Sequence, residues 1–241
     1  MSPDILSQLA PTGVLRAGIN MSNFLLVTGR DAAGDPQGVS PSMARAIADR
    51  LGVPVQYLPY PKPGDLADAV GTGAWDIGLI GAEPQRAEKI AFTAAYAEIE
   101  ATYLVPAGSP ITRIDQVDQP GIRIAVTDRS AYGLWLDRNI HRATLVRTDS
   151  LDSACAKFRD DNLEALAGLR PRLLTDVQTL PGARILDGQF TAVQQAIGTA
   201  RANSAATAFL HAFVEEAKAS GLVARFIAQH GVRGLSVAPA A

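Results

Sequence analysis

The stretch from Trp75 to Tyr96, WDIGLIGAEPQRAEKIAFTAAY, constrains the fold of this chain more than any other stretch. Its residues Ile77 to Ile80 form a short apolar run bounded by glycines, as expected for a strand that is buried on both faces. Glu83-Pro84 follows, and a proline at a first helical position is a helix start signal. The stretch therefore predicts a buried strand whose carboxyl end turns directly into a helix, the place where α/β folds bind ligands.

Arg86 lies in the first turn of this predicted helix, which we expect to run to about Ile90. First turns favour acidic side chains, so a cation there opposes the helix dipole. Backbone N–H groups at a helix start already attract an anion, and a guanidinium adds a fork that suits a carboxylate. Two interpretations stay open: an anion site formed by Arg86 with Gly81 and Glu83 beside it, or a surface ion pair from Arg86 to Glu83 or Glu88.

The segments on either side alternate between predicted strands and helices. Residues 14–20 read as a first strand that leads into a polar segment containing Asn23, and residues 40–52 read as a helix closed by a glycine. A strand over residues 54–60 and a short helix over residues 65–70 complete a β-α-β-α-β order, which predicts a parallel sheet covered by helices. Residues 237–241 carry no structural signal, and we expect them to be loose.

Pro84-Gln85-Arg86, followed by KIAFTAAY at residues 89–96, resembles the "T-P-E-R-x-x-x-x-x-F-S-x-P-Y" segment of the family 3 extracellular solute-binding proteins. These proteins are the polar-amino-acid receptors of ABC importers, and the resemblance covers nearly the whole chain in order. It implies an α/β, two-lobed fold of the type II periplasmic-binding-protein kind, in which each lobe is a mostly parallel sheet flanked by helices and two linking strands act as a hinge. It assigns residues 1–99 to lobe 1, residues 100–193 to lobe 2 and residues 194–241 to the return into lobe 1.

The resemblance also implies ligand contacts. In the family, the arginine at the position of Arg86 grips the α-carboxylate of the ligand. Residues 126–131 resemble the "V-x-x-G-T/S-x" loop of lobe 2, which binds the carboxylate from the other side, although Arg129 replaces the glycine. Thr127, Ser130 and Ala131 are therefore expected contacts, and Ser130 is also a good helix N-cap. Gln194 and Gln195 alternate on the second linking strand, so that one of them faces the cleft, and we select Gln194.

The chain departs from the family pattern at Leu169. The family places an aspartate at the end of this strand, where it holds the α-ammonium of the ligand, whereas here an apolar residue is followed by Arg170. Moving an unpaired ammonium into a closed cleft costs several kcal/mol. Our hypothesis is an organic acid without an amine, read by Arg86 and Arg170. The alternatives are that Arg170 caps carbonyls of a nearby element, or that Glu98 or Glu100 replaces the missing aspartate.

Composition excludes several other functions. The chain has 241 residues with a net charge of −2, which gives no electrostatic case for nucleic acid, and no apolar run approaches the ~18 residues of a membrane span. The single cysteine, Cys155, is interpreted as a core thiol. No motif for catalysis, a cofactor or a metal is present, so we expect none of them. The resemblance implies a monomer whose partners are a small anionic or zwitterionic solute and an ABC transporter permease.

Two alternative functions stay open. Cyclohexadienyl dehydratases are built on the same scaffold, and such an enzyme would need Glu98, Glu100 or Glu164 as a general acid; burial at a strand start would raise the pKa of Glu164. A cytosolic sensor or scavenger is suggested by residues 1–12, which lack the basic start and apolar stretch of a secretory signal. The resemblance implies a periplasmic protein whose signal has been removed, and a cytoplasmic one is the alternative.

Overall fold

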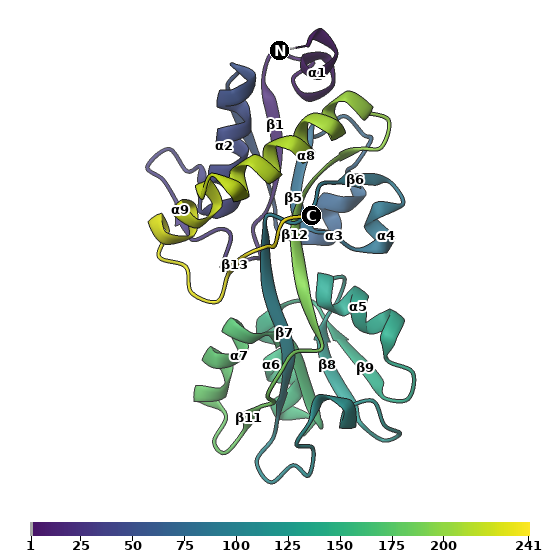
Figure 1. Ribbon diagram of the computed structural model, residues 1–241. Coiled ribbons are helices and arrows are strands. Elements are labelled where there is room, and N and C mark those ends of the chain that lie inside the picture. The colour runs from purple at the N-terminus through teal and green to yellow at the C-terminus, as the bar shows by residue number, and fades with distance from the viewer. Residues whose placement is uncertain (1) are drawn as a thin grey trace. The chain divides into compact units, whose positions relative to one another are not determined.

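The computed structural model describes residues 2–241, so that Met1, the first residue of the predicted first lobe, lies outside the described part. The chain folds into two compact units (Figure 1). Unit 1 ends its first segment at Glu98 and resumes at Gln194, and unit 2 comprises Ile99–Val193. The chain therefore passes between the units twice.

Unit 1 contains the predicted parallel sheet, in the order β4-β1-β5-β12, with β6 paired to β12. β1 runs parallel to both β4 and β5, whereas β12 is antiparallel to β5. All five residues of β5 are buried, which confirms the strand predicted from the apolar run. The strands of this sheet are β1 (Leu15–Asn20), β4 (Val55–Tyr60), β5 (Ile77–Gly81), β6 (Ile90–Phe92) and β12 (Thr191–Ala200); a separate small hairpin joins β2 (Gly29–Arg30) and β3 (Pro36–Gln37).

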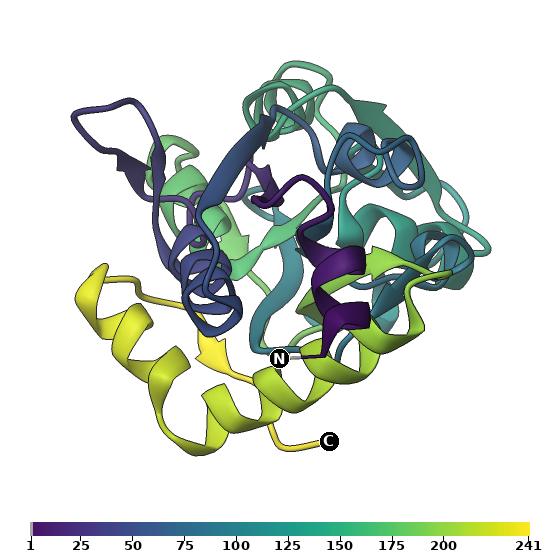
Figure 2. The same ribbon diagram turned by 90° about the horizontal axis from the view of Figure 1, so that it is seen from above.

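Six helices flank the sheet of unit 1. Among them, α1 packs against α8, and α9 packs against both α8 and α2. Figure 2 shows α1 beside α8 and α9 following from the other end of α8. A core of Leu66, Trp75, Ile80 and Ile90 lies beneath α3. The helices are α1 (Pro3–Leu9), α2 (Val39–Leu51), α3 (Pro63–Asp68), α4 (Pro84–Ala87), α8 (Ser204–Ala219) and α9 (Leu222–Gln229).

Unit 2 has the strand order β7-β10-β8-β9, with β11 paired to β7. β8 is parallel to β9 and β10, and β10 is antiparallel to β7. Cys155, with 9% of its surface exposed, belongs to the core of this unit, as the sequence predicted. The strands and helices are β7 (Ala97–Val105), β8 (Arg123–Thr127), α5 (Ala131–Asn139), β9 (Thr144–Thr148), α6 (Leu151–Asp160), β10 (Ala165–Leu169), α7 (Arg170–Asp176) and β11 (Arg184–Ile185), with short 3-10 turns at Ile114–Gln116 and Val177–Thr179.

The end of the chain is ordered, so the expectation of a loose tail is wrong. Ser236–Val237 form strand β13, which pairs with Glu98 and Ala97 of β7. The amide of Ala238 donates to the carbonyl of Tyr96 at 3.2 Å, and the Ala238 side chain is buried. Backbone hydrogen bonds with β7 hold the tail, although its sequence has no periodic apolar pattern.

Candidate functional site

The candidate residues of unit 1 gather at one edge of its sheet. β1 and β5 are parallel, with Ile19 beside Leu79, so their carboxyl ends at Asn20 and Gly81 meet at the same edge. The Asn23 side chain is buried just beyond β1, where its Oδ1 accepts a hydrogen bond from the amide of Leu25 at 3.2 Å. Asn23 and the turn after Gly81 are thus both located where parallel sheets bind ligands.

Arg86 is a buried cation at this edge. Only 6% of its surface is exposed, and its Nη1 donates to the carbonyl oxygen of Gly81 at 2.7 Å. A surface ion pair, one of the two sequence interpretations, does not describe a residue buried to this extent. The helix that carries Arg86 is shorter than predicted, because α4 ends at Ala87 and Ile90 already starts strand β6.

Glu83 and Gln194 surround the same turn. Glu83 is the N-cap of α4 and is 7% exposed, so this residue is about as buried as Arg86. The carbonyl of Gln194 accepts a hydrogen bond from the Ala82 amide at 2.8 Å, which fixes β12 against the turn. Gln194 is half-buried, whereas its neighbour Gln195 is 2% exposed, and the Oε1 of Gln195 has no hydrogen-bond partner among residues 2–241.

Unit 2 has an equivalent edge, where the parallel strands β8 and β10 end at Thr127 and Leu169. Ser130 is the N-cap of α5, and its hydroxyl accepts from the amide of Gly133 at 3.0 Å, as predicted. Ala131, half-buried, opens the helix. Arg129 has a φ of 53°, in the left-handed region that favours glycine. The loop therefore keeps a glycine-like backbone although the glycine is missing.

Two buried hydroxyls at this edge are unsatisfied in the described part of the chain. Neither the Oγ1 of Thr127 nor the hydroxyl of Tyr132 has a hydrogen-bond partner of normal geometry. Burial raises the pKa of Tyr132, and the nearby hydroxyls of Thr127 and Ser130 oppose part of that rise. The sequence predicted contacts from Thr127 and Ser130 but not the Tyr132 hydroxyl, for which the signal was the position of Tyr132 two residues after the N-cap, among the buried residues of α5.

Arg170 is engaged within unit 2. Its Nε donates to Oε2 of Glu100 at 2.6 Å, and its Nη2 donates to the carbonyls of Leu186 and Gly188. These contacts match the alternative in which Arg170 caps carbonyls of a nearby element. They also occupy Glu100, one of the two residues that we considered as replacements for the family aspartate. Leu169, at the end of β10, is 7% exposed.

The prediction that burial raises the pKa of Glu164 is wrong. Its carboxylate accepts hydrogen bonds from the Arg123 guanidinium at 2.8 and 2.9 Å and from the Arg123 amide at 2.8 Å. These contacts with Arg123 lower the pKa of Glu164 in spite of its partial burial. A carboxylate held in its charged form is a poor general acid near neutral pH.

One protein-family model matches most of the chain. Residues 15–232 match the bacterial extracellular solute-binding proteins, family 3. The chain belongs to this family. The turn that carries Arg86 and the loop from Thr127 to Ala131 both lie inside the matched range. A comparison with curated proteins finds no match.

Solved structures share the two-lobed fold of this solute-binding family. A mutant of ArgBP from T. maritima is 18% identical, with a TM-score of 0.74 over 95% of this chain and 100% of that chain. The ancestral amino acid-binding protein AncCDT-1, a precursor of cyclohexadienyl dehydratase, is 18% identical, with a TM-score of 0.74 over 93% and 97%. A histidine kinase sensor domain with similarity to periplasmic binding proteins is 15% identical, with a TM-score of 0.76 over 93% and 98%. At these identities the likeness establishes the fold alone.

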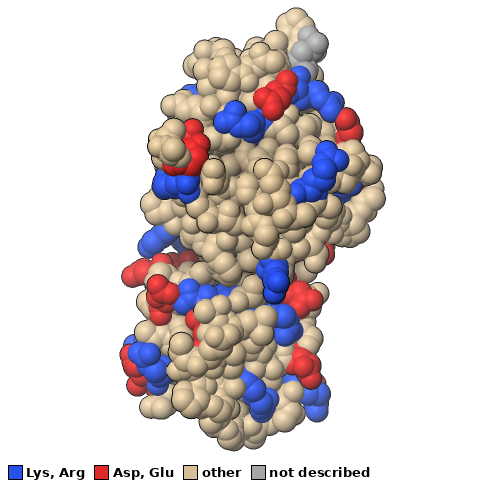
Figure 3. Space-filling model, turned by 90° about the vertical axis from the view of Figure 1, so that its left-hand side faces the viewer, with Lys and Arg blue, Asp and Glu red and all other residues tan. Residues whose placement is uncertain are grey.

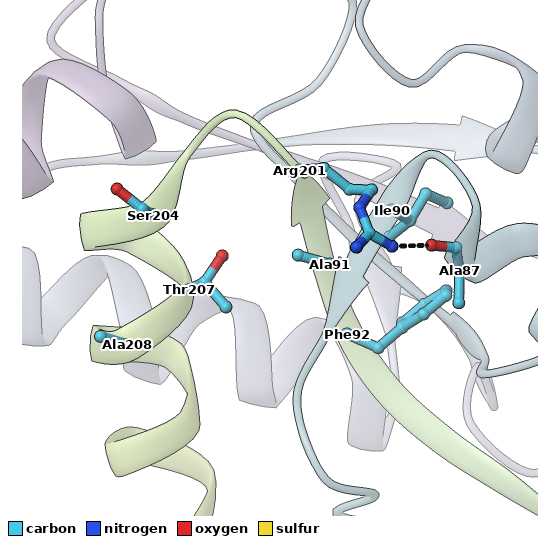
Figure 4. A pocket seen from close by; sticks show the side chains of 8 residues that line it. All are labelled: Ala87, Ile90, Ala91, Phe92, Arg201, Ser204, Thr207 and Ala208. Atoms are coloured by element: carbon cyan, nitrogen blue, oxygen red, sulfur yellow. Dashed lines mark hydrogen bonds between the residues drawn. The ribbon is translucent and has the colours of Figure 1, made fainter.

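Other features of the surface are plainer. A pocket of about 510 Å³ in unit 1 lies between α8 and β6, and its walls are mostly apolar (Figure 4). There the guanidinium of Arg201 donates to the carbonyl of Ala87.

On the face shown in Figure 3, basic and acidic side chains are interspersed. Within residues 2–241, no group of His, Cys, Asp and Glu is arranged to hold a metal ion, and no helix is both long and apolar enough to span a membrane.

Proposed function

We propose that this protein binds a small carboxylate-bearing solute without catalysis and delivers it to the permease of an ABC importer. The observation that carries the proposal is the buried Arg86, held at the carboxyl end of β5 in the segment that resembles the carboxylate-binding turn of the family. A guanidinium there offers a charge-assisted, two-pronged contact to a carboxylate. The further ligand contacts that we propose in unit 1 are Asn23, Gly81, Glu83 and Gln194.

Unit 2 supplies the second set of proposed contacts. The hydroxyls of Thr127 and Ser130 and the first amides of α5, beginning with Ala131, are donors at the end of β8. The unsatisfied Oγ1 of Thr127 supports this assignment, because buried polar atoms in native proteins are nearly always paired, with protein, water or ligand. We propose that these donors, like Arg86 in unit 1, bind a carboxylate. The contacts of Arg170 favour a structural role, so we leave it out of this set.

The ligand we propose is an organic acid without an α-ammonium group. The family's ammonium partner is replaced by the apolar Leu169, and two acids of unit 2 are engaged: Glu100 pairs with Arg170, and Asp176 pairs with Arg172 at 2.8 Å. Glu98, the other residue considered as a replacement, belongs to unit 1. An ammonium at this strand end would thus lack a dedicated counter-charge, at a cost of several kcal/mol in a closed site.

The state of the candidate general acids favours transport over catalysis. A dehydratase on this scaffold needs a general acid, and Glu164 is held in its charged form by Arg123. Glu98 is half-buried on β7, and Glu100 is exposed and paired. As a transport receptor of an extracellular solute-binding family, the protein would act in the periplasm as a monomer.

The test is a thermal-shift panel of matched pairs that differ only in the amine, such as glutarate against glutamate and succinate against aspartate. A ligand present at a hundred times its dissociation constant adds about 2.7 kcal/mol of stability. For a chain of this size, this corresponds to roughly 5–10 °C in Tm. We expect the amine-free member of a pair to give the larger shift.

Two results would contradict the proposal at different levels. Larger shifts with amino acids would keep the transport function but reject the ligand class, and would mean that another acid holds the ammonium. Turnover of prephenate or arogenate, followed by the appearance of the aromatic product, would reject non-catalytic binding itself.

A further inference from the structure

Arg170 contacts both chain segments that lead out of unit 2. Its Nε donates to Glu100 on β7, two residues beyond the first passage between the units at Glu98–Ile99. Its Nη2 donates to the carbonyl oxygens of Leu186 and Gly188, which precede the second passage at Val193–Gln194. One guanidinium thus connects the end of β10 to both linking segments, close to where they leave unit 2.

The first linking strand, β7, is also paired on either side of its passage. In unit 1, Ala97 and Glu98 pair with β13. In unit 2, Ala101 pairs with Leu169, the residue immediately before Arg170. Glu100 therefore lies at the start of the part of β7 that is fixed to β10, where an ion pair has the most influence on bending.

The second linking segment follows β7 closely until it reaches Arg170. The amide of Leu186 donates to the carbonyl of Tyr103 at 2.9 Å, and the amide of Phe190 donates to Ala101 at 3.0 Å. Between these bonds the chain bends at Gly188, which has a φ of 74°. Arg170 binds carbonyls on this bend, and the Phe190 ring packs on that of Tyr103 with centroids 4.5 Å apart.

We propose that Arg170 is a hinge clamp, defined by its contacts with Glu100, Leu186 and Gly188. It is a positioning residue: without touching the ligand, it limits how far the two linking strands bend where they leave unit 2. The inference rests on the proposed function in one respect only, the benefit of the clamp. In a binding protein, the clamp would narrow the range of positions that the units take before the ligand binds.

The geometry suits positioning more than stabilisation. The Arg170 side chain is 27% exposed and that of Glu100 is 56% exposed, and ion pairs at such exposure contribute little to stability. A planar guanidinium that bonds a carboxylate and two carbonyls nevertheless fixes their relative orientation, which a lysine does not. Loss of the clamp should thus change motion more than it changes Tm.

The test measures distances between the units in ligand-free protein by double electron–electron resonance. Spin labels at A219C in α8 and T144C in β9, both exposed positions, report on units 1 and 2, in a Cys155→Ser background that removes the single native cysteine. We expect a broader distance distribution for Arg170→Gln than for the parent protein. Glu100→Gln, which keeps the carbonyl bonds, should broaden it less.

The matched control is Arg123→Gln, because Arg123 also pairs with a carboxylate, that of Glu164, and donates to the carbonyl of Asn162 in unit 2, but these partners precede β10 and do not lie on a linking segment. We expect its distribution to keep the parental width even where its Tm falls. A parental width in both Arg170→Gln and Glu100→Gln, or equal broadening in the Arg123→Gln control, would overturn the proposal. No ligand is needed, so this outcome is independent of the transport function.

Discussion

Replacing Arg86 by methionine separates its structural role from its role in binding. Methionine fills most of the buried volume but removes the charge and the hydrogen bond to Gly81. The carbonyl of Gly81 would then lose its donor in a buried site, which costs about 1–3 kcal/mol of folding stability. The variant should therefore be less stable without ligand, by an amount that the protein tolerates.

The effect on binding is larger and has a different signature. Losing one partner of a buried charge contact costs about 2–5 kcal/mol, and 2.7 kcal/mol raises Kd roughly a hundredfold. At a ligand concentration of about 100 times the wild-type Kd, the wild type gains about 2.7 kcal/mol of stability, whereas the variant, now at its own Kd, gains only about 0.4 kcal/mol. The ligand-induced shift in Tm should fall from roughly 5–10 °C to about 1 °C.

The control is Arg201→Met. This residue is exposed, and its guanidinium also donates to α4, through the carbonyl of Ala87, but in the pocket beside β6. Its ligand-induced shift should stay at the wild-type value in the same thermal-shift assay, with calorimetry as a check on Kd. If Arg86→Met keeps the wild-type ligand shift, Arg86 is a structural cation and the proposed carboxylate site is wrong.

Three further variants test separate parts of the reasoning. Leu169→Asp supplies the missing counter-charge, so its affinity for the amino acid of each matched pair, measured by calorimetry, should rise about tenfold or more. An unchanged preference between the amine-free acid and the amino acid would reject our interpretation of Leu169. The hydrogen bonds from Arg123 lower the pKa of Glu164. The ionised carboxylate therefore stabilises the fold fully above about pH 5. This stabilisation is lost as the pH falls below the normal glutamate pKa of about 4.3 and through the lowered pKa of Glu164. Urea unfolding of the wild type and Glu164→Gln should thus differ at neutral pH and converge in acid, and a constant difference would contradict the assigned pKa. In Gly198→Ala, the new Cβ would lie 2.3 Å from Cγ2 of the buried Ile90. We expect this overlap to lower the free energy of unfolding by about 1–3 kcal/mol, measured in urea. An unchanged urea midpoint would refute the predicted overlap.

Local sequence patterns predicted the elements that depend on local physics. The apolar run of β5, the N-cap at Ser130 and the core position of Cys155 each follow from a few neighbouring residues, and the structure has all three. The α/β order followed in the same way, because each strand and helix carries its own periodicity. The length of α4 did not follow, since β6 takes over at Ile90 through pairing with β12, far along the chain.

The contacts that the sequence did not predict join residues that are distant in the sequence. Glu164 and Arg123 are 41 residues apart, and Arg170 and Glu100 are 70 residues apart. No pattern around Glu164 indicates that a guanidinium on another strand will hold it charged, so burial alone suggested the wrong direction for its pKa. The tail was misjudged for the same reason, because its partner, β7, belongs to the middle of the chain.

The discontinuity of unit 1 determines the order in which the protein can be completed during synthesis. All of unit 2 is encoded before Gln194, so every residue it needs is present while the last 48 residues are still to be added. At about 5–20 residues per second, β12 is complete about a second later, and α8 and β13 follow over the next several seconds. Until then, β5 lacks its antiparallel neighbour and the first segment of unit 1 carries exposed apolar faces. A nascent chain that has reached Gln194 thus contains the whole sequence of unit 2, whereas unit 1 still lacks α8 and α9, the helices that pack against α1 and α2.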